Sequence, residues 1–409
     1  MQQKHLVVIG GGAAGFFCAI NAAEKNKNLQ ITIIEKTVNV LSKVKISGGG
    51  RCNVTHACFE IELLSKNYPR GERFLKKAFH WFNTNDTVLW FSKKGITLKT
   101  EADGRMFPST NSSQTIIDCL LKEAHKLGIT IITQTSVEEI QKINNAWEIK
   151  CMQKPSITAD FVCVTTGGFS KATQFKWLTN LGHSIENPVP SLFTFNIPNN
   201  TITALMGLSV SSAQLKIVGT KLITQGPVLI THWGFSGPAV LKLSAIAARE
   251  LADKNYEFSI LINWCSNLYN YEQIKQILLH EKTVKATQQI ANSNLLNLPK
   301  RLWQYFVDIA GIKNQQTWAN ATAQQINLLA TTLTQQEFKI KGKTTFKEEF
   351  VTCGGIKLNE VDVNTMQSKC CNNLFFAGEV LDIDGVTGGF NFQNAWTTGY
   401  IAAKAIAAL

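Results

Sequence analysis

The chain has 409 residues, a length that favours two or three domains. Hydrophobic residues make up 44% of it, and 41 Lys and Arg against 29 Asp and Glu give a net charge of +12. This charge favours an anionic partner without choosing among nucleic acid, lipid head groups and a phosphate-bearing ligand. No uninterrupted apolar run of about 18 residues occurs, so no transmembrane helix is predicted.

The apolar stretch 6–20 is broken by Gly10 to Gly12 and lacks a suitable cleavage site, so no export signal is expected. Ten cysteines without regular spacing indicate free thiols and predict a cytoplasmic location. The adjacent Cys370 and Cys371 precede an apolar strand and are interpreted as core residues. The sequence contains no HExxH motif, CxxC pair or paired-histidine spacing, and we therefore predict no metal site.

The beginning of the chain follows the order strand, glycine turn, helix, strand, acid. The apolar run 5–9 is typical of a strand buried on both faces. It leads into Gly10-Gly11-Gly12-Ala13-Ala14-Gly15, which fits the pattern GxGxxG. Residues 16–25 then read as a helix and residues 30–34 as a second strand that ends at Glu35. This order predicts a dinucleotide-binding unit, with a structural turn in another α/β unit as the alternative.

Each part of this unit has a physical task. Gly10 permits the tight turn, Gly12 lets the backbone approach a pyrophosphate, and Gly15 allows close packing of helix and strand. The helix N-terminus at Ala13 offers unpaired N–H groups and a positive dipole end to phosphates. Glu35 is placed to accept hydrogen bonds from an adenosine ribose and would repel a 2′-phosphate. The sequence therefore favours FAD or NAD over NADP at this position.

A second glycine-rich loop, residues 43–53, follows one strand later. Its three glycines let backbone amides point at one ligand, and its cations suit phosphate charge. A flexible surface loop without a ligand is the alternative. Cys52 is interpreted as a small packing residue. The loop contributes the candidate binding residues Lys43, Ser47, Gly48, Gly49, Gly50, Arg51, Cys52 and Asn53.

The end of the chain repeats the strand–glycine–helix arrangement. Residues 373–377 read as a buried strand followed by Gly378 and Glu379, and Gly388-Gly389 open a helix over 391–408. Glu379 could bind ribityl hydroxyls. The amides from Gly389 to Asn391 could face the pyrimidine edge of a flavin, where negative charge accumulates on reduction. An ordinary glycine-rich βα turn is the alternative.

In the middle of the chain, Ser112 or Ser113 caps a predicted helix that ends at Gly128. Two constellations there could carry chemistry. His232 lies in a strand-to-helix turn and could donate a proton over a flavin, or only cap backbone groups. Arg105 could hold a substrate carboxylate or carbonyl oxygen, with a solvated surface arginine as the alternative.

Four runs together resemble the aminoacetone-oxidase-like (BaiN-like) NAD(P)/FAD-dependent oxidoreductases: GGGAAG, SGGGRCNVTH, THWGFSGPAVLKLS and LFFAGEVLDIDGVTGGFNFQNAW. The resemblance runs from end to end. It implies an α/β fold with non-covalent FAD on a glutathione-reductase-type Rossmann domain, plus an inserted β-barrel-like domain with a helical portion. The expected ranges are 1–190 and 344–409 for the FAD domain and 191–343 for the insert, which is barrel-like over 191–268 and 335–343 and helical over 269–334.

Carried over by position, the resemblance assigns the first glycine run and Glu35 to the ADP moiety and Val137 to the adenine. The second glycine loop would approach the pyrophosphate and flavin. The other residues that the resemblance implies as FAD contacts, together with their sequence neighbours, are Lys36, Thr166, Gly167, Gly168, Gly378, Glu379, Gly388, Gly389, Phe390 and Asn391.

The predicted function is FAD-dependent hydride transfer through flavin N5, with NAD(P)H reducing an unsaturated organic substrate. NAD(P)H would bind transiently, because the insert has no second GxGxxG unit. Amine oxidation with O₂ is the first alternative. The second is a flavoprotein that acts on RNA, for which the basic stretch Lys66, Arg70, Arg73, Lys76 and Lys77 is the best candidate surface. A small-molecule substrate is expected, and a nucleic-acid partner is not.

Overall fold

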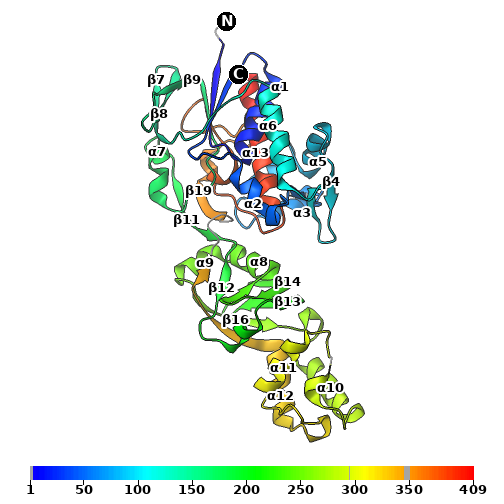
Figure 1. Ribbon diagram of the computed structural model, residues 1–409. Coiled ribbons are helices and arrows are strands. Elements are labelled where there is room, and N and C mark those ends of the chain that lie inside the picture. The colour runs from blue at the N-terminus through cyan, green and yellow to red at the C-terminus, as the bar shows by residue number, and fades with distance from the viewer. Residues whose placement is uncertain (1–2, 294, 345–350) are drawn as a thin grey trace. The chain divides into compact units, whose positions relative to one another are not determined.

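The computed structural model describes residues 3–293, 295–344 and 351–409. It forms two compact units, the first made of residues 1–191 and 347–409 and the second of residues 192–346. The first unit thus contains both ends of the chain, which Figure 1 shows in blue and red. No helix among the described residues is long and apolar enough to cross a membrane.

A five-stranded parallel sheet forms the centre of the first unit, in the order β20-β10-β1-β2-β6. Apolar runs form these strands because both faces of the sheet are covered, and every residue of β10 and β20 is buried. This parallel sheet confirms the predicted mixed α/β Rossmann-like fold class. The strands are β1 (His5–Ile9), β2 (Gln30–Ile34), β6 (Thr130–Ile132), β10 (Phe161–Val164) and β20 (Leu374–Phe376).

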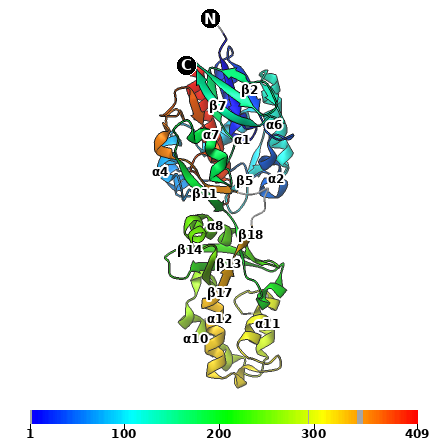
Figure 2. The same cartoon turned by 90° about the vertical axis from the view of Figure 1, so that its left-hand side faces the viewer.

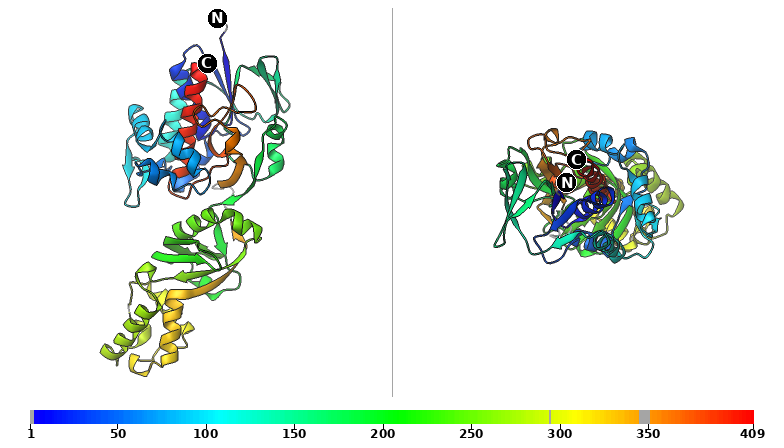
Figure 3. Two further views of the ribbon diagram at one scale, coloured as in Figure 1. Left: turned by 180° about the vertical axis from the view of Figure 1, so that it is seen from behind. Right: turned by 90° about the horizontal axis from the view of Figure 1, so that it is seen from above.

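Three long helices cover one face of this sheet, and an antiparallel sheet lies on the other side (Figure 1). Seen from behind and from above, α1 and α13 run side by side (Figure 3). The Ser112 hydroxyl accepts a hydrogen bond from the Gln114 N–H at 3.3 Å, which confirms the predicted cap. The helices are α1 (Ala13–Lys25), α6 (Ser113–Lys126) and α13 (Phe390–Ala408), and the strands are β7 (Val137–Ile143), β8 (Ala146–Cys151) and β9 (Ile157–Ala159).

Shorter elements complete the first unit around the carboxyl ends of its strands. Strands β3, β5 and β4 form one small antiparallel sheet, and β11 and β19 form another. These elements are α2 (Ser42–Gly50), β3 (Thr55–His56), α3 (Ile61–Ser65), α4 (Glu72–Ala78), α5 (Thr84–Lys93), β4 (Leu98–Thr100), β5 (Arg105–Pro108), α7 (Lys176–Thr179), β11 (Ile185–Ser191) and β19 (Val351–Ile356).

The second unit contains a seven-stranded sheet in the order β17-β16-β13-β14-β15-β12-β18. Only Gly342 separates the two edge strands in sequence, so the sheet must curl towards closure. Its strands are β12 (Thr194–Asn196), β13 (Ser209–Ile217), β14 (Ile223–Ile230), β15 (Gly234–Ser236), β16 (Glu257–Asn263), β17 (Gln336–Lys341) and β18 (Lys343–Thr344).

Helices flank this curled sheet (Figure 2), and aromatic side chains join the two within one core. The Trp264 ring lies 5.7 Å from Phe306 of α11, and Phe235 lies 4.8 Å from Phe338. The helices are α8 (Pro238–Ile246), α9 (Ala248–Asp253), α10 (Tyr271–Val284), α11 (Lys300–Ile309) and α12 (Ala323–Gln335).

Candidate cofactor-binding site

The turn between β1 and α1 is tightly packed at two glycines and open at a third. Gly10 has a φ of +116°, and a Cβ there would lie 2.5 Å from the Thr165 carbonyl oxygen. A Cβ at Gly15 would collide with the Gly10 carbonyl oxygen. By contrast, no atom lies within 4 Å of the position that a Cβ at Gly12 would take.

Gly12 is also the N-cap of α1, which has no side-chain cap and no acid in its first turn. The amides that follow, at Ala13 and Ala14, lie at the positive end of the helix dipole. Open space beside an uncapped helix N-terminus is the arrangement that binds a phosphate group.

Glu35 lies beside this turn at the end of β2. Its carboxylate accepts hydrogen bonds from the Gly11 N–H and the Thr37 N–H, both at 2.9 Å, and from the Thr37 hydroxyl at 2.8 Å. The Glu35 carbonyl oxygen accepts a hydrogen bond from the Thr135 N–H at 2.9 Å. Val137, the first residue of β7, lies two positions after Thr135 in the chain. A carboxylate has about four lone-pair sites, so the three hydrogen bonds to it leave capacity for about one more, from a ribose hydroxyl. The neighbouring Lys36 ammonium lies 5.9 Å from the Phe169 ring.

The second glycine loop forms a sharp kink at the end of α2. Ser47, Gly48 and Gly49 depart from helical dihedral angles, and φ is positive at Gly48, Gly49 and Gly50. A Cβ at Gly49 or Gly50 would meet no atom within 4 Å. The loop therefore leaves its backbone open on one side, as a ligand-binding loop requires.

Arg51 and Cys52 follow this loop and have different environments. The Arg51 guanidinium lies 4.0 Å from the centre of the Phe107 ring and pairs with Glu101 at 2.6 Å. Burial raises the pKa of the Cys52 thiol to about 12. A thiol in this state stays protonated, and only the thiolate is reactive. Cys52 is thus a packing residue, and its chemistry gives no support to a redox role.

The two ends of the chain meet at an ion pair. The Lys43 ammonium lies 2.7 Å from the Glu379 carboxylate, although 336 positions separate the two residues. Gly378 packs against α1, since a Cβ there would lie 2.9 Å from the Ala14 Cβ. Glu379 also accepts a hydrogen bond from the Thr352 N–H at 2.9 Å.

The returning strand β10 ends at the same place. A Cβ at Gly167 would lie 3.8 Å from both the Glu379 carboxylate and the Lys43 ammonium, and one at Gly168 would collide with Thr352. The Thr166 hydroxyl donates to the Gly167 carbonyl oxygen at 3.2 Å. The first glycine turn, the second glycine loop and the carboxyl ends of β10 and β20 therefore border one site.

The N-terminus of α13 closes the site. Gly389, its N-cap, has a φ of +96° and no side-chain cap, and a Cβ there would lie 2.6 Å from the Thr55 carbonyl oxygen. The Asn391 side chain accepts a hydrogen bond from the Gly385 N–H at 2.8 Å and donates one to the Gly385 carbonyl oxygen at 3.0 Å. Because this side chain does not cap the helix, the first amides of α13 can bind a ligand. His56 lies against this turn, with Nδ1 3.0 Å from the Gly388 oxygen and its ring stacked on Phe390 at 4.7 Å.

Two buried side-chain oxygens at this site have no hydrogen-bond partner among the described residues, Asn53 Oδ1 and Thr352 Oγ1. Asn53 Oδ1 faces Gly389, where a Cβ would lie 2.9 Å away, and Thr352 Oγ1 faces Gly168. Buried polar atoms are rarely left unpaired in proteins. Together with two uncapped helix N-termini, these atoms fit a long, polar, phosphate-bearing ligand such as FAD.

The sequence matches the model of the HI0933-like protein Rossmann domain family over residues 4–405. The chain belongs to this family. It is 29% identical to ribosomal RNA dihydrouridine synthase of Haemophilus influenzae and 25% identical to 3-dehydro-bile acid delta(4,6)-reductase of Clostridium scindens, over 99% of each chain. These matches confirm the BaiN-like resemblance and the assignment to Rossmann-fold flavoprotein oxidoreductases.

A solved member of the same fold is 3-ketosteroid delta1-dehydrogenase from Sterolibacterium denitrificans, with a TM-score of 0.52 at 10% identity. The match covers 98% of this chain and 99% of that chain. At this identity the likeness concerns the fold alone.

The two candidate catalytic residues lie in different units of this HI0933-like chain. Arg105 begins β5, and its guanidinium pairs with Asp103 at 2.7 Å and with Glu101 at 3.3 Å. His232 is an exposed residue of the second unit, and its ring lies 4.1 Å from that of Trp233.

Sequence reasoning did not single out His56, although it ends the SGGGRCNVTH run that contributes to the family resemblance. It also placed Arg70 on an exposed basic surface, which is wrong. The Arg70 side chain is 13% exposed and pairs with the fully buried Asp384. The sequence could not reveal this, because a basic residue near other basic residues gives no sign of a buried partner elsewhere in the chain.

Proposed function

We propose that the protein is an FAD-dependent reductase that uses NAD(P)H to saturate a carbon–carbon double bond conjugated to a carbonyl group. The observation that carries the FAD assignment is the presence, within one unit, of two uncapped helix N-termini from opposite ends of the chain, at Gly12 and Gly389. Bound FAD would supply the two-electron chemistry by accepting a hydride and passing it on.

In this proposal the chain positions the cofactor and handles charge. The α1 N-terminus would hold the pyrophosphate, and Glu35 would hold the ribose. The α13 N-terminus would favour negative charge on the ring. The proposed cofactor residues are Gly10, Gly12, Ala13, Ala14, Gly15, Glu35, Lys36, Lys43, Ser47, Gly48, Gly49, Gly50, Arg51, Cys52, Asn53, Val137, Thr166, Gly167, Gly168, Gly378, Glu379, Gly388, Gly389, Phe390 and Asn391.

Two residues are proposed to act on the substrate. Arg105 would orient the carbonyl oxygen, because Asp103 and Glu101 already hold its guanidinium in a fixed direction. His232 would donate the proton that completes the reduction, a general-acid role that histidine side chains often have.

The substrate class follows from what two relatives share. One is named for reducing the 4,6 double bonds of a 3-dehydro bile acid and the other for forming dihydrouridine in ribosomal RNA. In both substrates the double bond is conjugated to a carbonyl, which makes its far carbon able to accept a hydride. This common chemistry supports reduction of an unsaturated carbonyl compound by the present chain.

The proposal predicts a flavin that NAD(P)H bleaches and an enone restores. The purified protein should be yellow, and denaturation should release FAD. Anaerobic stopped-flow absorbance would follow bleaching by NADH and by NADPH, then recovery with a panel of enones, saturated ketones, amines and O₂. Rapid recovery with enones and none with the matched saturated ketones is the expected result.

Other outcomes would contradict the proposal. A colourless protein that does not take up FAD removes the cofactor assignment. Bleaching by an amine without any nicotinamide, followed by rapid recovery with O₂, would instead identify an amine oxidase.

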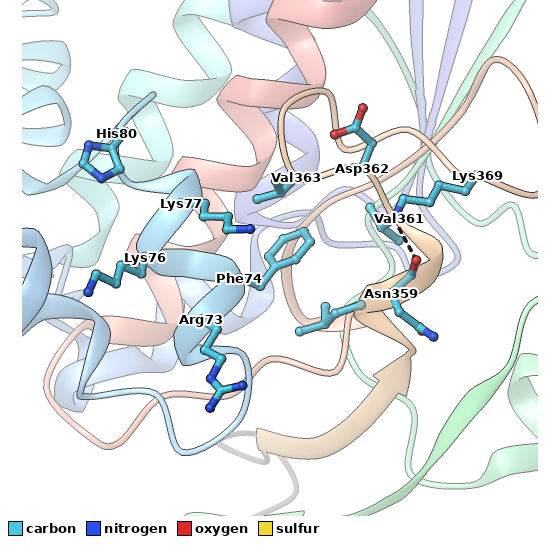
Figure 4. A pocket seen from close by; sticks show the side chains of 11 residues that line it. Arg73, Phe74, Lys76, Lys77, His80, Asn359, Val361, Asp362, Val363 and Lys369 are labelled. Carbon is cyan, nitrogen blue, oxygen red and sulfur yellow. Dashed lines mark hydrogen bonds between the residues drawn. The ribbon is translucent and has the colours of Figure 1, made fainter.

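A uracil ring within RNA is a second candidate substrate, favoured by a basic cavity as well as by the relative's name. The cavity has a volume of about 640 Å³ and lies between α4 and residues 358–369. In Figure 4, Lys77 and Phe74 of α4 face Lys369 across it. Arg73 also lines the cavity, and neither Arg73 nor Lys77 has an ion-pair partner within the described part of the chain. Cations beside an aromatic ring suit phosphates and a stacked base.

The RNA candidate predicts a salt-dependent affinity that depends on this cavity. Replacing Arg73 and Lys77 by glutamine should make the slope of log affinity against log salt shallower by roughly 0.7–0.9 for each phosphate that the variant no longer neutralises. Filter binding of ribosomal RNA across a salt series measures it. The pair Lys122→Gln and Lys126→Gln, on exposed positions of α6, removes equal charge and serves as the control. Equal slopes for the two pairs would remove the cavity from RNA binding.

A further inference from the structure

One carboxylate in the first unit contacts two arginines from separate segments. Glu101 Oε1 lies 2.6 Å from Arg51 Nη1, and Glu101 Oε2 lies 3.3 Å from Arg105 Nη2. These three side chains are between 27% and 38% exposed, so solvent screens the two ion pairs only in part. Because both oxygens belong to one rigid carboxylate, the orientation of one guanidinium depends on that of the other.

The backbone around Glu101 is fixed by a tight hairpin between β4 and β5. The Glu101 N–H donates to the Arg105 carbonyl oxygen at 2.8 Å, and the Gly104 N–H donates to the Glu101 carbonyl oxygen at 2.9 Å. Gly104 supplies the positive φ of +85° that this turn requires. Asp103 also accepts a hydrogen bond from Arg105 Nε at 2.7 Å. The motion that remains at this end of the hairpin is therefore mainly rotation of the Glu101 and Arg105 side chains.

The Phe107 ring is a second connection between this hairpin and the second glycine loop. It is fully buried, and its centre lies 4.0 Å from the Arg51 guanidinium carbon and 5.5 Å from that of Arg105. Such cation–π contacts keep both guanidinium groups beside the ring. A Cβ at Gly48 would lie 2.9 Å from the same ring, so the loop packs directly on it. The loop and Arg105 thus share two groups, the Glu101 carboxylate and the Phe107 ring.

We propose that Glu101 is a positioning residue that couples FAD binding at the second glycine loop to substrate binding at Arg105. This role rests on the proposed function, which places the cofactor at the loop and the substrate carbonyl oxygen at Arg105. Bound FAD would restrain Arg51, and Arg51 would restrain Arg105 through the shared carboxylate. The substrate then meets a guanidinium that has already lost its side-chain entropy, which raises the affinity. By linkage, bound substrate favours FAD binding by the same factor.

Arg105 keeps hydrogen-bond donors for a substrate in this arrangement. A guanidinium has five N–H donors on three nitrogens. Asp103 accepts from Nε and Glu101 from Nη2, so the N–H groups of Nη1 remain for a carbonyl oxygen.

Fluorescence titration of the cofactor-free full chain with FAD tests the cofactor side of this coupling. Glu101→Gln and Asp103→Asn each remove one negative charge beside Arg105, but of the two acids only Glu101 also pairs with Arg51. The difference between the two variants therefore reports the contact with Arg51 and not the charge. We expect Glu101→Gln to bind FAD roughly fivefold more weakly than Asp103→Asn, at the lower end of the usual range for coupled sites. Equal affinities of the two variants would overturn the proposal.

A double-mutant cycle tests the substrate side, with the enone cyclohexenone as the probe. The FAD-loaded protein is reduced with dithionite, and anaerobic stopped-flow absorbance follows reoxidation at rising enone concentration, which gives a dissociation constant and a limiting rate. Arg51→Gln and Arg105→Gln should be non-additive in the dissociation constant by at least about threefold. The same two substitutions should be additive once Glu101→Gln is present. A carboxylate with a merely structural role would not decide whether the two arginines are coupled.

The control is Glu250→Gln, which removes a carboxylate from an exposed ion pair with Lys254 in the second unit. It should leave the FAD and enone dissociation constants within about twofold of wild type, as the loss of a surface ion pair does. An enone-reducing chain in which the two arginines are additive, or stay coupled in the Glu101→Gln background, would overturn the coupling and leave the proposed function intact. A chain that takes up no FAD, or whose reduced flavin no enone reoxidises, would overturn both.

Discussion

Replacing Asp384 by leucine is expected to lower the free energy of unfolding by about 3–5 kcal/mol, the usual cost of breaking a buried ion pair by removing one of its members. The Asp384 side chain is fully buried and accepts hydrogen bonds from Arg70 Nε at 2.6 Å and from the Ser191 hydroxyl at 2.7 Å. Without this carboxylate the largely buried Arg70 guanidinium loses this ion pair and the hydrogen bond that its Nε donates. Denaturant unfolding of wild type and variant measures the difference.

A double variant separates the loss of the ion pair from the effect of keeping the Arg70 charge after Asp384 is removed. Arg70→Met with Asp384→Leu replaces the pair by apolar side chains, a change that is often close to neutral. The double variant should therefore recover most of the stability lost in Asp384→Leu. If the two variants are equally unstable, the damage comes from packing or from the missing hydrogen bond to Ser191.

The same pair shows which parts of the site a sequence can reveal. The glycine turn after β1 was recognisable because strand, glycines, helix and acid follow one another within a short span. The Arg70–Asp384, Lys43–Glu379 and His56–Gly388 contacts join residues more than 300 positions apart. Only the folding of the two chain ends into one sheet brings them together, so no local pattern indicates them.

The cysteine pair and the basic stretch were misinterpreted because the environment of each residue depends on the fold and not on its sequence neighbours. Adjacent cysteines before an apolar strand were interpreted as buried, yet the chain turns before β20 and leaves Cys370 at the surface. The basic stretch before and along α4 was interpreted as one surface. The Arg70 side chain is largely covered instead, at 13% exposed, while Arg73 and Lys77 line a cavity. In both cases the position of a turn decided the environment.

Replacing Gly12 by alanine should weaken FAD binding by about tenfold to a hundredfold, which corresponds to the loss of one charge-assisted hydrogen bond of about 1.5–3 kcal/mol. The added methyl group meets no protein atom within 4 Å, and the backbone at this residue is extended, with a φ of −94°. The cofactor-free variant should therefore unfold within about 1 kcal/mol of the wild type. Fluorescence titration of the cofactor-free protein with FAD measures the affinity.

Gly15→Ala in the same turn distinguishes ligand contact from protein packing. Its methyl group would collide with the Gly10 carbonyl oxygen and lie 2.7 Å from the Thr165 hydroxyl. Overpacking of this kind costs about 1–3 kcal/mol, so this variant should be less stable even without FAD. A Gly12→Ala variant with normal stability and weak FAD binding would mean that the ligand itself fills the space beside the α1 N-terminus. Unchanged FAD affinity in that variant would place the pyrophosphate elsewhere.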